Sequence, residues 1–373
     1  MLQVDHPDRP LDPALLDAPG GFAWWYADAR NSDGDGLVLI RSWGLPFLPG
    51  DRSARLAGNP PLPKDRPSVN LALYRDGHPE FYTLHTLEPS RAAWIEGGGG
   101  RFGECEAHFE RTGDEVALHV HIDLPIAGEV GRLQGPIVVR GPHLHGDAPE
   151  HANLVHAWTP VMGPARCKAE LTRGGQPYFT FEGDGYADRN GSAVSFDDLG
   201  LDRWIWGRAT VGGRALVYYL SFPDTADAKP HMILWEAGPD GAFTVTDVDH
   251  AEFEAIEFTW LGMPWWRRIV LHVGEERLLI DFMAPVDTGP FYLRLQTSVI
   301  RGTQGGFGWA EICVPDRIDL GVHRPLVRMC VHPERGPSSM WLPLFGGPSA
   351  GRVARLLRTW RGAAPRLGGA TGA

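Results

Sequence analysis

Apolar and polar residues alternate along most of the chain, in short runs that are separated by turns. Segments 68–87, 104–124 and 167–181 alternate on both sides of a glycine-containing turn, and similar patterns surround Gly241 and Gly274. A period of two residues is typical of strands with one buried face, and tight turns join such strands into hairpins. The body of the chain has no long amphipathic helical pattern. The sequence therefore predicts an all-β, mainly antiparallel protein, built as sandwiches or barrels.

The alternation is interrupted near residues 190–203, where Asn190-Gly191-Ser192 precedes a short acidic loop. We expect a domain boundary here. It gives a first β domain over residues 1–195, a second over 196–335 and a tail over 336–373. One continuous sandwich is the alternative, and the pattern does not decide between the two.

The tail differs from the rest of the chain in period and in charge. Four apolar residues fall at i, i+3, i+4 and i+7, one stripe of a helix: Val353, Leu356, Leu357 and Trp360. Five arginines make the tail basic: Arg352, Arg355, Arg358, Arg361 and Arg366. Such a helix could lie on a membrane surface, which suits a substrate that dissolves in lipid. The alternative is a terminal helix packed on its own domain.

Composition narrows the class of protein. The 373 residues include 47 glycines and 32 prolines, which suits many short strands joined by turns. The net charge of −11 argues against a nucleic-acid partner. Four widely spaced cysteines without a CxxC pair favour reduced thiols in the cytoplasm. The acidic start lacks the apolar core of a signal peptide, and no apolar run is long enough to span a membrane. We expect a cytoplasmic protein that could be peripheral to the membrane.

Several motifs match known sites only formally. Residues 98–103 fit GxGxxG, but an alternating strand follows them where a nucleotide site needs a helix. Residues 31–36 resemble the start of a calcium loop, yet Ser42 stands where a bidentate Glu is required. The pairs His119/His121 and His143/His145 lack a third ligand at motif spacing. We expect turns and strand faces here, with no metal and no cofactor.

The segment 156–209 is the most informative part of the chain. It contains three pairs at spacing i, i+2: His156 with Trp158, Tyr186 with Asp188, and Trp204 with Trp206. Residues two apart on a strand share a face. An acid, an imidazole and several aromatic rings could therefore converge on one apolar pocket.

Such a pocket would suit the protonation of an alkene. A carboxylic acid at its reference pKa of about 4 is ionised at neutral pH, but burial among aromatic rings can raise that pKa by several units. Asp188 could then donate a proton to carbon, while Tyr186 or His156 orients it. The faces of Trp158, Trp204 or Trp206 could stabilise the tertiary carbocation, and a positioned water would complete hydration.

The same residues of segment 156–209 can also be interpreted as purely structural. The sequence Gly-Tyr-x-Asp-x-Asn can form a turn in which Asp188 and Asn190 bond the backbone. Tryptophans at alternating strand positions are more often core residues than catalytic ones, and a lone His is usually a satisfied polar group. The residue pattern alone leaves both interpretations open.

The same block resembles the carotenoid 1,2-hydratase (hydroxyneurosporene synthase) family. The resemblance rests on His-x-Trp-x-Pro, Gly-x-Gly-Tyr-x-Asp-x-Asn and Trp-x-Trp-x-Arg-Ala elements, at residues 156–160, 183–190 and 204–209. Residues 68–74 and 289–294 are similar to further family elements, so the match covers roughly residues 20–330 in order.

The resemblance implies two lipocalin-like β domains and cofactor-free hydration of a terminal isoprenoid double bond. The family's functional positions would fall on His156, Trp158, Tyr186 and Asp188, with Asp188 as proton donor. The sequence departs from the family at Gly191 and at residues 192–196. It departs again at Gly207, where Ser is usual, and at residues 24–26.

Three functions remain open at this point. The first is a hydratase that acts on a carotenoid or related polyene. The second is a cyclase or pericyclase of a natural-product pathway, which would fold its substrate without adding water. The third is a carrier of an apolar ligand without chemistry, since a fold does not decide function.

Overall fold

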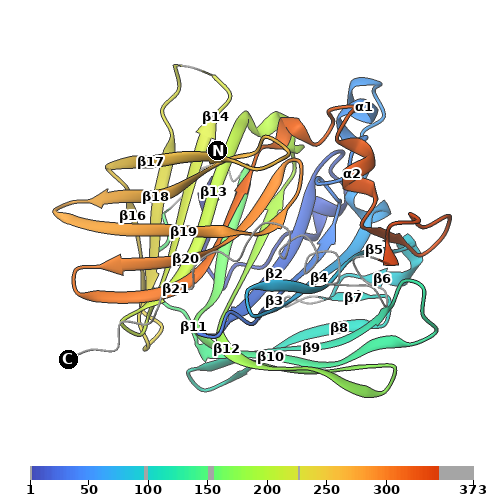
Figure 1. The fold of residues 1–373 in the computed structure, drawn as a ribbon, viewed down its shortest axis with the longest axis horizontal. Helices are drawn as coiled ribbons and strands as arrows, with labels where there is room; N and C mark the ends of the chain where they lie inside the picture. Colours follow the sequence, from blue (N-terminus) through green and yellow to red (C-terminus); the bar gives the residue numbers. More distant parts are fainter. Residues whose placement is uncertain (1, 96–99, 150–154, 226, 344–373) are drawn as a thin grey trace.

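The computed structural model describes residues 2–95, 100–149, 155–225 and 227–343, and most of these residues lie in two curled β-sheets (Figure 1). The first sheet is built from β1 (Leu2–Val4), β2 (Phe22–Arg30), β3 (Gly36–Trp43), β4 (Pro67–Arg75), β5 (His78–Thr86), β6 (Ala92–Ala93), β7 (Gly100–Phe102), β8 (Cys105–Thr112), β9 (Glu115–Pro125), β10 (Arg132–Pro142), β11 (His156–Arg173), β12 (Gln176–Ser192) and β22 (Val331–Pro333). Its strand order is β22-β5-β4-β3-β2-β12-β11-β10-β9-β8-β7-β6, with β1 beside β11.

The second sheet follows in the chain and contains β13 (Leu201–Val211), β14 (Arg214–Pro223), β15 (His231–Ala237), β16 (Phe243–Asp247), β17 (His250–Phe258), β18 (Pro264–Val273), β19 (Glu276–Thr288), β20 (Tyr292–Arg301) and β21 (Gln304–Cys313). Its order is β16-β15-β14-β13-β21-β20-β19-β18-β17. The helices are short: α1 (Asp51–Leu56), α2 (Arg324–Arg328) and the 3-10 turns Pro13–Asp17, Pro63–Asp65, Pro89–Arg91, Phe196–Leu199 and Pro315–Arg317.

The predicted fold class and hairpins are confirmed. Each of the five predicted turns joins two paired strands: β4 to β5, β8 to β9, β11 to β12, β15 to β16 and β18 to β19. The β11–β12 hairpin is longer than the alternation over 167–181 indicated, because it continues through residues buried on both faces. It therefore carries His156, Trp158, Tyr186 and Asp188 on two adjacent strands.

Strand β2 shows why the centre of the first sheet lacks a clear alternation. All nine of its residues are buried. Ala23, Trp25 and Ala27 pack into the core inside the curl of the first sheet. Trp24 and Tyr26, on the other face, pack into a cluster shared with the second sheet. A strand that is covered on both sides reads as one apolar run, so its period is hidden.

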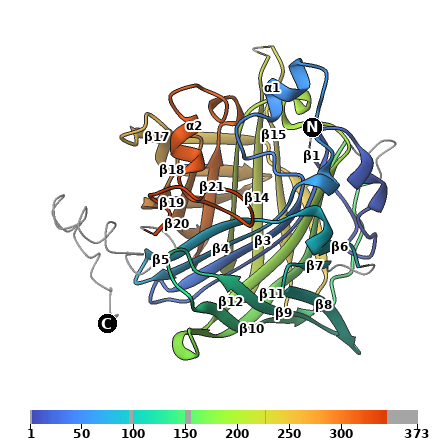
Figure 2. The ribbon, with the colours of Figure 1, turned by 90° about the vertical axis from the view of Figure 1, so that its right-hand side faces the viewer.

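Strand β13 has the same double burial in the second sheet. Trp204 and Trp206 face the first sheet, whereas Ile205 and Ala209 belong to the second sheet's own core. The two sheets thus meet along β2, β11 and β12 on one side and β13, β14 and β21 on the other, strands that are labelled in Figure 1 and turned by 90° in Figure 2. This interface holds the residues that the sequence singled out.

The structure explains why glycine stands at position 207, where the family usually has serine. Gly207 is paired with Tyr218 on β14, and a Cβ at position 207 would lie 2.1 Å from the Tyr218 hydroxyl oxygen. Tyr218 is fully buried, so its ring has little freedom to move away. The glycine leaves room for this tyrosine.

The chain changes sheets between Ser192 and Leu201, close to the predicted boundary. The short strand β22 returns to the first sheet and pairs in parallel with β5. The division into domains 1–195 and 196–335 stays a prediction. The predicted tail helix lies outside the described residues. No helix within the described ranges is both long enough and apolar enough to cross a bilayer.

Candidate functional site

Asp188 lies on β12 at the interface of the two sheets, and it is almost completely buried. Its Oδ2 accepts hydrogen bonds from Trp158 Nε1 at 2.8 Å and from the Tyr186 hydroxyl at 3.1 Å. Its Oδ1 accepts a third bond from Asn190 Nδ2 at 3.0 Å. Strand geometry explains the convergence, because residues 186, 188 and 190 share one face of β12 and Trp158 is paired with Asn190.

This environment raises the pKa of Asp188 to about 8. Burial is the largest cause, since it disfavours the charged carboxylate, and the bonds from Trp158 and Tyr186 lower the pKa by a smaller amount. The negative charges of Glu311 and Asp28 raise it further. A carboxyl group with this pKa is largely protonated at neutral pH and can act as an acid.

His156 joins the group through Asn190 rather than directly. One of its ring nitrogens, Nε2, lies 3.3 Å from Asn190 Oδ1, and Nδ1 is buried without a partner among the described residues. Burial lowers the pKa of His156 to about 4, so the ring is neutral at physiological pH. Asn190 therefore bridges His156 to the carboxyl group, a role that the sequence analysis did not assign to it.

The two tryptophans of β13 lie in different surroundings. The Trp206 ring is 5.8 Å from the Tyr186 ring and 5.3 Å from the Tyr26 ring, which places it beside the carboxyl group's neighbours. Trp204 instead packs on Phe196 at 5.3 Å and on Phe47 at 6.3 Å. Of the two, it is Trp206 that contacts the ring of Tyr186, a hydrogen-bond partner of Asp188.

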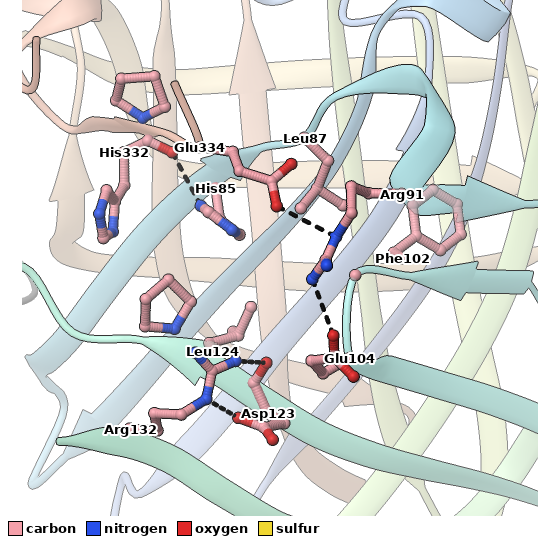
Figure 3. Close-up of a pocket in the computed structure, with 13 residues that line it drawn as sticks. His85, Leu87, Arg91, Phe102, Glu104, Asp123, Leu124, Arg132, His332 and Glu334 are labelled. Carbon is pink, nitrogen blue, oxygen red and sulfur yellow. Dashed lines mark hydrogen bonds and ion pairs between the residues drawn. The ribbon is translucent and has the colours of Figure 1, made fainter. Parts of the chain in front are cut away.

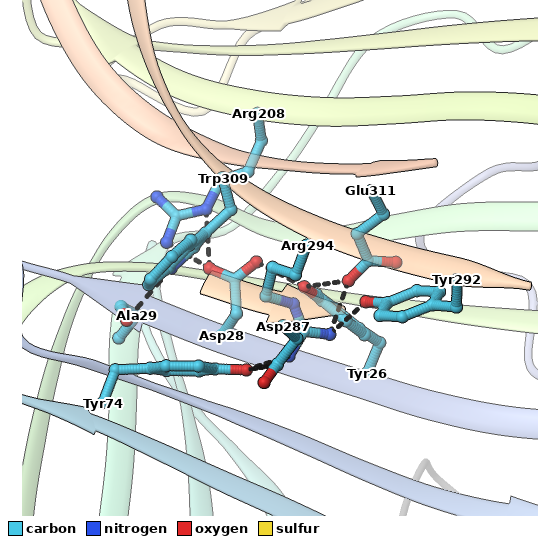
Figure 4. A network of polar contacts seen from close by, with 10 residues as sticks. All are labelled: Tyr26, Asp28, Ala29, Tyr74, Arg208, Asp287, Tyr292, Arg294, Trp309 and Glu311. Carbon is cyan, nitrogen blue, oxygen red and sulfur yellow. Dashed lines mark hydrogen bonds and ion pairs between the residues drawn. The ribbon is translucent and has the colours of Figure 1, made fainter. Parts of the chain in front are cut away.

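A second buried polar network crosses the interface (Figure 4), and its Tyr26 ring lies 6.5 Å from the Tyr186 ring. Asp28 on β2 is completely buried and pairs with Arg208 of β13, whose Nε lies 2.6 Å from Asp28 Oδ1. Tyr26 places its hydroxyl 2.8 Å from Asp28 Oδ2 and 3.1 Å from Glu311 Oε1. Desolvation raises the pKa of Asp28, while the neighbouring Arg208 lowers it.

Arg294 of β20 is the second cation of the network. It donates to Glu311 Oε1 at 2.8 Å and to the Tyr74 hydroxyl at 2.7 Å, and Asp287 lies 3.6 Å away. Burial raises the pKa of Asp287, and the charge of Arg294 opposes that rise. Sequence reasoning missed this network, because the contacts that join the two sheets link residues 180 to 285 positions apart and follow no local motif.

A cavity away from Asp188 has a different character. It has a volume of about 250 Å³ and is lined mostly by residues of the first sheet together with β22 (Figure 3). Arg91 pairs there with Glu104 and Glu334, and Arg132 pairs with Asp123. Its cations are matched by carboxylates, so it does not resemble a site for an apolar chain.

The motifs that the sequence analysis set aside take structural places. Gly100–Phe102 is the strand β7, and Asn31 Oδ1 accepts backbone bonds from Asp33 and Asp35 in the turn after β2. His119 stacks on His108 at 5.0 Å. In the part of the chain that the structure covers, no three His, Cys, Asp or Glu side chains are grouped as metal ligands.

Comparison with known proteins identifies relatives of this chain. The family model of the carotenoid hydratase CrtC matches residues 61–302, more than half of the chain. The hydroxyneurosporene dehydrogenase of Chlorobaculum tepidum is 27% identical over 301 residues, which cover 75% of this chain and 77% of that protein. The acyclic carotenoid 1,2-hydratase of Thiocapsa roseopersicina is 32% identical over 205 residues, 54% of this chain and 47% of the relative. The chain thus spans about half the length of this hydratase.

Solved structures share the fold. An AttH protein of Nitrosomonas europaea superimposes with a TM-score of 0.57 at 14% identity, covering 82% of this chain and 98% of that one. CghA in complex with Sch210972 gives a TM-score of 0.51 at 11% identity, covering 83% and 94%. At such identities the likeness concerns the fold alone, and it supports the predicted lipocalin-like class. The extent of the family match is decisive: this chain belongs to the carotenoid hydratase CrtC family.

Proposed function

We propose that this chain adds water to a terminal isoprenoid double bond of a carotenoid or related polyene, without a cofactor, and that Asp188 donates the proton. Membership of a carotenoid hydratase family supports the hydratase reaction and an apolar polyene as substrate. The observation that carries the proposal is a buried carboxyl group whose pKa is raised to about 8, surrounded by aromatic rings. A solvated aspartate would be ionised at neutral pH and could not protonate carbon.

The hydrogen bonds around Asp188 suit both halves of a proton transfer. In the acid form Asp188 can deliver its proton to the alkene carbon, which forms a C–H bond and leaves a tertiary cation on the neighbouring carbon. Trp158, Tyr186 and Asn190 then stabilise the carboxylate that remains. We assign His156 the positioning of Asn190, and through it of Asp188.

The aromatic side chains suit the cation. The rings of Trp206, Tyr186 and Tyr26 lie within 5.3 to 6.5 Å of one another, next to the carboxyl group. An aromatic face attracts a cation by up to about 2 kcal/mol when both are desolvated, and it does not form a bond that would trap it. Addition of water and loss of one proton give a tertiary alcohol.

Incubation of the purified protein with neurosporene or lycopene in ¹⁸O-labelled water tests the proposal. We expect a product heavier by one labelled water, and Asp188→Asn should lower kcat by 10²-fold or more, since an amide cannot donate the proton. Asp184→Asn is the matched control on the same strand, because Asp184 is exposed and pairs with Arg166. A product of unchanged mass would indicate a cyclase. Tight binding without turnover, unaffected by Asp188→Asn, would indicate a carrier.

Two further expectations remain predictions from sequence. The basic tail would bring the protein to a membrane surface, and the protein would reside in the cytoplasm. Sedimentation with vesicles that contain anionic lipid, before and after removal of residues 344–373, would test the first, since a basic amphipathic helix binds anionic surfaces.

A further inference from the structure

Hydration involves a second proton transfer, because the attacking water loses a proton when its oxygen bonds to carbon, and a second carboxyl group nearby could accept it. Asp188 lies on the first sheet. The second sheet contributes another carboxyl group, Glu311 on β21, which lies beside Tyr26 and Arg294 in Figure 4. The hydrogen bonds from Tyr26 and Arg294 hold Glu311 in a defined position.

Strand register places Glu311 opposite Asp188. In the first sheet Asp188 is paired with Tyr26, whose hydroxyl lies 3.1 Å from Glu311 Oε1. In the second sheet Glu311 is paired with Trp206, whose ring contacts both Tyr26 and Tyr186. These three rings form one cluster that reaches Asp188 on one sheet and Glu311 on the other.

The two carboxyl groups have different partners. Asp188 accepts bonds from the neutral donors Trp158, Tyr186 and Asn190. Glu311 forms an ion pair with Arg294, whose terminal nitrogen lies 2.8 Å from Oε1. A carboxyl group with neutral donors in an apolar site suits an acid, whereas one paired with a guanidinium suits a base.

Glu311 also retains capacity to bind water. The bonds from Tyr26 and Arg294 both go to Oε1, and the Tyr292 hydroxyl also hydrogen bonds the Glu311 side chain. Two carboxylate oxygens offer about four acceptor positions, so Glu311 can accept a further bond from water. The side chain is 13% exposed, in contrast to the sealed Asp28 beside it. A water could therefore reach Glu311 while remaining next to the aromatic cluster.

We propose that Glu311 is the base that accepts a proton from the attacking water, an inference that rests on the hydration proposed above. The Asp188 O–H bond breaks as the C–H bond forms. The water oxygen then bonds to the cationic carbon, and one of its protons moves to the Glu311 carboxylate. When the alcohol leaves, Glu311 loses this proton to solvent and Asp188 regains one. The sum is one alkene and one water converted to one alcohol.

Glu311→Gln in D₂O separates the two proton transfers. Asp188 would still deliver a deuteron to the alkene, but water would attack slowly. The cation would then return a proton from carbon to Asp188, so recovered polyene would carry deuterium. We expect hydration to fall by about 10²-fold or more while deuterium incorporation continues. Asp188→Asn should abolish both.

Controls make the outcomes distinct. Glu276→Gln changes an exposed carboxylate that pairs with Arg301 of the same sheet, and it should hydrate like the unaltered protein. If Glu311→Gln does not fold, as judged by its thermal transition, Glu311→Asp keeps the charge and should lower the ratio of hydration to exchange. Hydration by Glu311→Gln within threefold of normal would overturn the inference. Parallel loss of hydration and exchange in a folded Glu311→Gln would also overturn it. If the unaltered protein neither hydrates nor exchanges, the proposed function itself fails.

Discussion

Two opposing influences act on the carboxyl group of Asp188. Loss of solvent favours its acid form, and three directed donors favour its carboxylate. A pKa of about 8 results from that opposition. The sequence predicted that the pairs His156/Trp158 and Tyr186/Asp188 could project into one cavity, because residues two apart on a strand share a face. It did not predict Asn190 as a bridge, because an Asx residue after a Gly-rich stretch reads as a turn.

The hydrogen bond that Trp158 donates to Asp188 leads to a prediction about the pH dependence of kcat. Asp188 works as an acid, so kcat should decline as the pH rises through about 8. Trp158→Phe removes a bond that favours the carboxylate. The pKa of Asp188 should therefore rise, and the alkaline limb of the kcat profile should move to higher pH. We also expect kcat to fall by roughly 10- to 100-fold, because the carboxylate formed during the reaction loses one donor.

The pH profile of Trp260→Phe provides the comparison for this variant. Trp260 is 67% exposed and lies in the turn after β17. Its replacement should leave the alkaline limb in place. If the alkaline limb of the kcat profile stays near pH 8 in Trp158→Phe, a group other than Asp188 controls the decline of kcat.

At the level of strands, alternation predicted the hairpins whose outer face meets water. It was silent on β2 and on the inner half of the β11–β12 hairpin, because both faces of these strands are covered. Burial by a second sheet is a property of the whole fold, and a window of nine residues does not contain it. The need for glycine at position 207 was hidden for a similar reason. The side chain that occupies the space of a Cβ there is Tyr218, which is eleven positions away on β14.

Gly207 yields a prediction on stability. Gly207→Ser places a Cβ against the buried Tyr218 hydroxyl, and we expect the free energy of unfolding in urea to fall by about 1–3 kcal/mol. Combined with Tyr218→Leu, the same serine should cost less than it does alone. A double-mutant cycle measures this coupling. Strictly additive effects would show that the two residues do not compete for space.

At the scale of the molecule, the interface between the sheets carries charges as well as rings. Both side chains of the Asp28–Arg208 ion pair are buried, so each charge is stabilised by the other in place of water. A sequence pattern does not pair an aspartate with an arginine 180 residues away, and this is why the network was not predicted. The family resemblance named candidate residues on β11 and β12, but it did not name their neighbours across the interface.

Removal of one member of this pair should be costly. Asp28→Ala leaves the Arg208 charge buried without its carboxylate, and we expect the free energy of unfolding to fall by about 3–5 kcal/mol. The reference is Asp184→Ala, which breaks an exposed pair with Arg166 and should cost less than about 1 kcal/mol. Chemical denaturation of both variants tests the difference. Equal small losses would mean that water reaches Arg208.

The pairing of β22 with β5 has a consequence for the order of assembly. The strand that completes one end of the first sheet comes from residues 331–333, after every strand of the second sheet has been made. During synthesis on a ribosome, the β5 edge must therefore wait for nearly all of the described chain to emerge. Until then this early-made sheet has an open border, where a chaperone or a neighbouring nascent chain could attach.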